Sequence, residues 1–98
     1  MQYRLEAALD EAWILSENMG KRPIETFLSA FADAARISYT RVEQSLCDCS
    51  AVFESGADAE ALCAKAQKCL DGMVGTCTVT PAEKSLHRLL RRSTGSTV

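Results

Sequence analysis

The chain has 98 residues, a formal net charge of −2 and 47 % hydrophobic residues, a length that suits one small domain. Alanine and cysteine supply 14 and 5 of the hydrophobic residues, whereas isoleucine and valine are scarce. Because strands favour β-branched residues, this composition is typical of helices and argues against an all-β domain and against intrinsic disorder. It also predicts a thin core, since small side chains bury little area each.

The cysteines and the first residues bear on the compartment. Five cysteines cannot all pair within one chain, and no apolar stretch of the secretory type follows the N-terminus. The apolar run near it, residues 12–15, is far too short to span a bilayer. We therefore expect a cytoplasmic protein with no membrane association and with reduced thiols.

The first predicted element is a helix over residues 3–19. Its apolar residues recur at the spacing of one helical face, and Gly20 stands where a helix commonly ends. Pro23 follows, and proline suits the first turn of a new helix.

A long helix over residues 24–55 is the second predicted element. Apolar or small residues recur there every three or four positions, at an average of about 3.6, and no proline or glycine intervenes before Gly56. Such a helix would span roughly 48 Å, which exceeds the roughly 33 Å diameter of a compact domain of this size. Either the helix breaks, for example near residues 47–50, or it packs on a partner. The unbroken stripe favours self-association.

The remaining elements are shorter. Asp58 is a candidate N-cap for a third helix, which should end between Gly72 and Gly75. Residues 74–80 are β-branched without a helical period, which favours an extended connector over one short edge strand, because a lone strand would have no partner. Residues 80–83 match a capping box that would start a last helix ending near Arg92.

Together these elements predict an all-α fold, a small irregular bundle of about four helices with the long central helix over 24–55. Residues 1–92 would form one helical domain, and residues 93–98 a disordered tail. Large side chains should lie in the core or at an interface. These anchors are Trp13, Phe27, Phe31, Tyr39 and Phe53.

No pattern points to catalysis or to a bound metal. On a helix the cysteine spacings, one and five intervening residues, place the thiols of each pair on diverging faces, so small core side chains are the favoured interpretation. Cys77 is the thiol most expected to be exposed. His87 is paired by spacing with Glu83, and no nucleophile is indicated near it. We therefore predict no catalytic residue, no metal ligand and no cofactor.

The C-terminal segment is basic. Residues 83–98 carry a net charge of +3 from Lys84, Arg88, Arg91 and Arg92 against one acid. A strip of this kind could contact phosphates, but cations near a helix C-terminus also suit the helix dipole.

The favoured function is a non-enzymatic interaction or regulatory module that acts through helix-face packing. Its expected partner is a second copy of the chain, in a homodimer, or a helix of another protein. One alternative is a nucleic-acid-binding regulator that uses the basic C-terminal segment. A second alternative is a helical protein that binds a small ligand or a metal, because a helical groove could hold either a ligand or a second copy.

Overall fold

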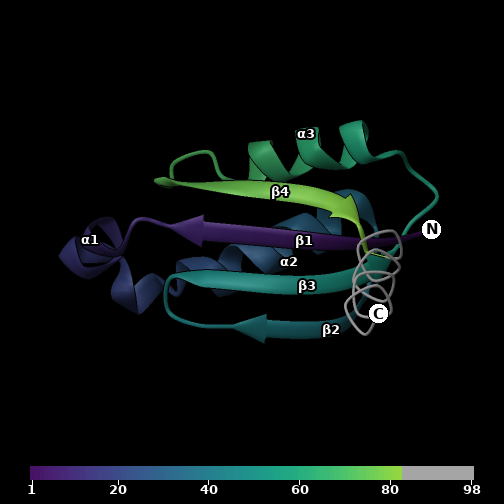
Figure 1. Cartoon of the computed structure of the whole chain (residues 1–98). Coiled ribbons are helices and arrows are strands. Elements are labelled where there is room, and N and C mark those ends of the chain that lie inside the picture. Colours follow the sequence, from purple (N-terminus) through teal and green to yellow (C-terminus); the bar gives the residue numbers. More distant parts are fainter. Residues whose placement is uncertain (83–98) are drawn as a thin grey trace, which may run out of the picture.

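The computed structural model describes residues 1–82, and these form a four-stranded antiparallel sheet with helices on one of its faces (Figure 1). The strands are β1 (Gln2–Leu9), β2 (Tyr39–Gln44), β3 (Asp48–Glu54) and β4 (Gly75–Pro81). They are ordered β2-β3-β1-β4, so β2 and β4 form the two edges. The chain order β-α-β-β-α-β with this strand order is the ferredoxin-like, split βαβ arrangement.

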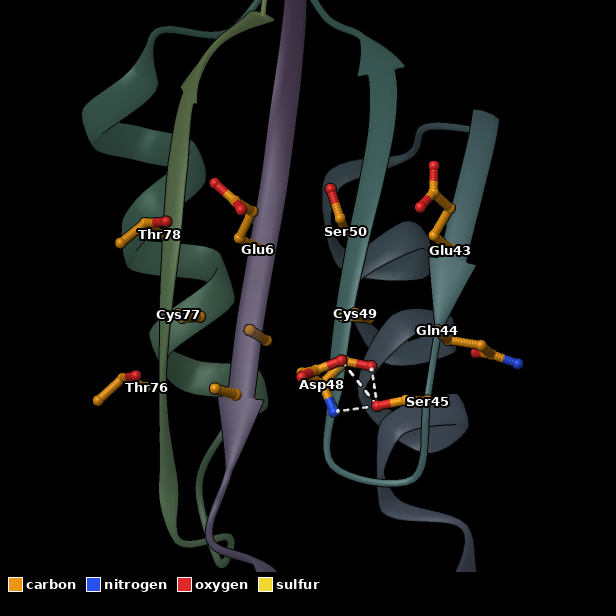
Figure 2. Close-up of a pocket in the computed structure, with 12 residues that line it drawn as sticks. Glu6, Glu43, Gln44, Ser45, Asp48, Cys49, Ser50, Thr76, Cys77 and Thr78 are labelled. Carbon is orange, nitrogen blue, oxygen red and sulfur yellow. Dashed lines mark hydrogen bonds between the residues drawn. The ribbon is translucent and has the colours of Figure 1, made fainter.

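Three helical segments connect or cover the strands. After β1 comes α1 (Glu11–Trp13), whose N-cap Asp10 accepts a hydrogen bond from the Trp13 amide, followed by irregular helical turns over Ile14–Lys21. The longer helices are α2 (Pro23–Ala35) and α3 (Ala59–Cys69). Figure 2 shows both of them behind the same face of the sheet, and no helix of residues 1–82 covers the opposite face.

The core lies between this sheet face and the two helices. Alternate residues of β1 and β3 point into it, as strand geometry requires, and Phe53 is fully buried among other aromatic rings. Its ring centroid lies 5.4 Å from that of Phe31, 5.8 Å from that of Tyr3 and 6.4 Å from that of Tyr39. These distances fall within the range of favourable aromatic pairs, so Phe53 joins β1, β2 and α2 at one point.

The predicted all-α bundle is wrong, because large parts of its first two helices form strands instead. The predicted helix over 24–55 ends at Ala35, and residues 39–54 form the β2–β3 hairpin. A β-bulge between Tyr39 and Arg41 puts Tyr39 and Val42 on the same sheet face although they are three residues apart. Cys49 and Phe53, four apart, also share a face, because side chains alternate. Apolar residues three and four positions apart therefore lie on one face of this hairpin, the same spacing that is typical of one face of a helix.

The predicted helix over 3–19 is also wrong in its first half. Tyr3, Leu5, Ala7 and Leu9 are buried at alternate positions of β1, and only the residues after Asp10 are helical. The alternation was visible, but the alanines and leucines of this segment are residues that favour helices. Pairing with β3 on one side and β4 on the other outweighed that preference.

Several local predictions are confirmed. Helix α2 begins at Pro23, and Asp58 caps α3 by accepting a hydrogen bond from the Ala61 amide at 2.8 Å. Residues 74–80 are extended as predicted, but the favoured unpaired connector is wrong, because Gly75–Pro81 form β4, an edge strand that pairs with β1. The predicted last helix lies outside the described residues apart from Thr80 and Pro81, which belong to β4, and the buried Ala82, and the tail over 93–98 lies wholly outside them.

Candidate interaction surfaces

The uncovered face of the sheet carries a shallow trough of about 590 Å³ (Figure 2). Three carboxylates border it, Glu6 from β1, Glu43 from β2 and Asp48 from β3, and small side chains such as Ala8 and Ser50 form its floor. The register places Glu6 beside Ser50 and Ser50 beside Glu43. The trough is thus a polar, acidic surface that small residues leave hollow.

Hydrogen bonds hold the β2–β3 turn at one end of this trough. The Ser45 hydroxyl donates to Asp48 Oδ1 at 2.7 Å and accepts from the Asp48 amide at 3.2 Å. The Ser45 amide donates to the Asp48 carbonyl at 2.8 Å. These bonds fix the Asp48 carboxylate, so this part of the border is preorganised.

The described residues do not assemble a metal centre. Within 1–82, no three side chains of the histidine, cysteine, aspartate or glutamate type come together as ligands for one ion. Cys49 and Cys77 lie directly beneath the trough but are buried on the face that the helices cover.

Burial also governs the thiols, all five of which are free. Removal from water raises the pKa of Cys49 to about 11, and nearby Asp48 adds to the rise. The pKa values of Cys69 and Cys77 are raised, again chiefly by burial. A thiol that resists ionisation is a poor nucleophile, so these cysteines act as small core side chains. The expectation of an exposed Cys77 is therefore wrong, because this side chain is only 8 % exposed.

The second surface is the free edge of β2. After the half-buried Tyr39, every residue from Thr40 to Gln44 is exposed. Val42 lies opposite the fully buried Ala51, hence on the helix side of the sheet, yet it is 43 % exposed. On the uncovered face, Arg41 Nη2 lies 3.4 Å from Glu43 Oε1 in an ion pair. With respect to the described residues, this edge therefore presents unpaired backbone groups, one apolar side chain and two opposite charges.

The other edge, β4, is covered. Cys77 and Val79 are buried beneath α3. The Cys63 thiol donates to the Val79 carbonyl, and Gln67 Nε2 donates to the Cys77 carbonyl, each at 3.5 Å. Helix α3 thus shields the helix side of this edge, while Thr76, Thr78 and Thr80 stay exposed on the other face.

The residues predicted as anchors lie in different places. Phe27, Phe31 and Phe53 are fully buried in the core. Trp13 and Tyr39 are half-buried, and the Tyr39 hydroxyl donates to the Leu28 carbonyl at 2.6 Å. The predicted phosphate contacts Lys84, Arg88, Arg91 and Arg92 lie outside the described residues, as does His87. Sequence reasoning missed the β2 edge, although the alternation from Arg41 to Glu43 was a signal for it.

Comparison with known proteins supports the fold. The chain resembles the crystal structure of a protein from Deinococcus radiodurans R1 described as a "putative transposase", with a TM-score of 0.50 and 8 % sequence identity. The superposition covers 98 % of this chain and 89 % of that one. At this identity the likeness shows the fold alone. No family model matches the sequence, and no curated protein matches it.

Among the described residues, no helix combines the length and the apolar character that crossing a bilayer requires. The chain thus has a ferredoxin-like fold, in which helices cover one face of the sheet and α3 lies over the edge strand β4.

Proposed function

We propose that the chain is a non-enzymatic interaction module that binds by adding a partner strand to the open edge of β2. The observation that carries this proposal is the contrast between the exposed residues of β2 and the shielded β4. The interaction role follows the expectation from sequence, but the contact moves from a helix face to a strand edge, since the long amphipathic helix does not exist.

The chemistry of the edge supports strand addition. A strand that docks there satisfies the outward backbone groups of β2, which is the main source of affinity in this mode of recognition. Val42 would contact an apolar side chain of the added strand on one face, and Arg41 and Glu43 would select opposite charges on the other. The fitting partner is thus an extended segment with a central apolar residue and charges at its flanking positions.

A cytoplasmic location belongs to this proposal. All five cysteines are free, and a reducing compartment would keep them so.

The test is to pan a library of displayed, strand-forming decapeptides against the protein and to map the hits by amide hydrogen exchange. Protection should increase in residues 39–44 and remain unchanged in β4. The matched control is Val42→Lys, since a lysine at a strand edge opposes strand pairing while an exposed position tolerates it. Hits that protect other residues, or that bind the Val42→Lys variant equally well, would contradict the proposed function.

A further inference from the structure

The charges of β2 are complementary to those of a second β2 strand that runs antiparallel to it. Around Val42, Arg41 and Glu43 stand at equal distances on either side, and so do Thr40 and Gln44. In an antiparallel pair, two residues that lie opposite each other point to the same face of the sheet. A second β2 strand can therefore pair with the first only in registers in which the residues that lie opposite each other point to the same face of the sheet.

Three such registers bring the centres of two β2 strands together. If the twofold axis passes beside Arg41, the two copies of Arg41 face each other. If it passes beside Glu43, the two Glu43 carboxylates face each other. Like charges directly opposite are unfavourable. If the axis passes beside Val42, Arg41 of each copy lies opposite Glu43 of the other, and the two copies of Val42 meet. Only this central register turns both charges into attractive contacts.

The surroundings of β2 allow this pairing. Arg41 and Glu43 have exposed side chains, at 74 % and 71 %, so the ion pair within each of the two copies can be exchanged for one between strands, two for two in the dimer. Val42 is 43 % exposed on the helix side, so the neighbouring helix leaves room there for a second apolar side chain. Figure 1 shows β2 at the outer margin of the sheet, with α3 at the opposite margin beside β4.

We infer that the partner strand is β2 of a second copy of this chain, paired antiparallel about a twofold axis at Val42 to give a continuous eight-stranded sheet. This inference rests on the proposed function, whose edge it uses. The paired segment is only six residues long, so the area it buries is far below the roughly 800 Å² per partner of a standard interface. The dimer should therefore be weak and should form in a concentration-dependent way.

The test uses sedimentation velocity on the whole chain from about 1 µM to about 1 mM, a range that covers weak association. Arg41→Glu places two acidic pairs across the axis, and Glu43→Arg places two basic pairs. Each substitution replaces two attractive contacts by two repulsive ones, so each should weaken the dimer by about tenfold or more. Circular dichroism confirms that the variants are folded, which the exposure of both side chains favours.

Two rescues make the test specific. An equimolar mixture of the Arg41→Glu and Glu43→Arg proteins should form a heterodimer, because every cross-strand pair is then of opposite charge. The double variant that carries both substitutions should again form a homodimer. Rescue in both experiments would establish the register, since a merely structural effect of the substitutions would not be reversed by mixing.

The contrary outcomes separate the two claims. A wild-type chain that stays monomeric at about 1 mM, or single variants that dimerise as strongly as wild type, would overturn the self-pairing. If displayed decapeptides still protect residues 39–44 in that case, the proposed function stands and only the identity of its partner is wrong. If they do not, both fall.

Discussion

The two edges of the sheet occupy corresponding positions in the fold, but within residues 1–82 helix side chains donate hydrogen bonds to the backbone of only one of them, β4. Helix α3 lies over β4, buries Cys77 and Val79, and donates side-chain hydrogen bonds to two of its carbonyls. Strand β2 is exposed from Thr40 onward and is tied to the helix layer through Tyr39. An edge that is left open in a sheet whose other edge is shielded is a binding surface or an aggregation hazard. The charges of β2 restrict which strands can use it.

The largest expected difference between the edges comes from shortening one apolar side chain at each. Leu62 of α3 is fully buried, so Leu62→Ala should lower the free energy of unfolding by about 2–5 kcal/mol. Val42→Ala removes an exposed side chain from β2 and should change it by less than about 0.5 kcal/mol. Urea denaturation measures both. Comparable losses would show that β2 is packed as tightly as β4.

Alkaline pH should weaken the core beneath β3, the central strand next to the open edge. Burial raises the pKa of Cys49 to about 11 from an ordinary value of 9.0, so the folded protein favours the protonated thiol. The contribution of the protonated Cys49 thiol to the free energy of unfolding is fully present below pH 9. It is lost as the pH rises towards 11, which should lower that free energy by about 1–3 kcal/mol. Denaturation at pH 8 and pH 10.5 measures the slope. Cys49→Ala is the control and should show a smaller slope. An unchanged slope would assign the pH dependence to another group.

The turn into β4 should tolerate no side chain. A Cβ at Gly75 would collide with the Ala8 carbonyl oxygen and would lie 2.8 Å from Leu9 Cα. Gly75→Ala should therefore destabilise the protein by about 1–3 kcal/mol, through a shift of β4 against β1. Gly56 has no neighbouring atom within 4 Å of such a Cβ, so Gly56→Ala should be nearly neutral. Thermal unfolding of both variants tests the contrast. Equal midpoints would mean that β4 adjusts without cost.

The smallest expected effect concerns the tether of β2. Tyr39→Phe removes the 2.6 Å hydrogen bond to the Leu28 carbonyl and should cost about 0.5–1.5 kcal/mol. It should also speed amide exchange in residues 40–44, because this bond ties the strand to α2. Tyr3→Phe removes a similar bond, to the Ala57 carbonyl at 2.8 Å, and serves as the control. If both variants speed exchange in β2 equally, Tyr39 has no particular role at this edge.

The elements with local signals could be predicted from the sequence. Pro23 at the start of α2, Asp58 at the cap of α3 and the extended character of β4 rest on contacts within a few residues. The edge of β2 could not be found in this way. Its exposure depends on which strand is central in the sheet, and that order is set by pairings between β1, β3 and β4, which are far apart in the chain.

The sequence by itself determined the starts of α2 and α3, the aromatic residues available for a core and the absence of β-branched residues from β1. Only the tertiary structure decided that residues 39–54 form a hairpin, because spacings of three across a bulge and of four along a strand satisfy a helix equally well. It also decided that Phe53 joins three elements and that β2 remains open. Long-range strand pairing buries the alternate residues of β1 and β3 together, and this outweighs the local preference of alanine and leucine for helices.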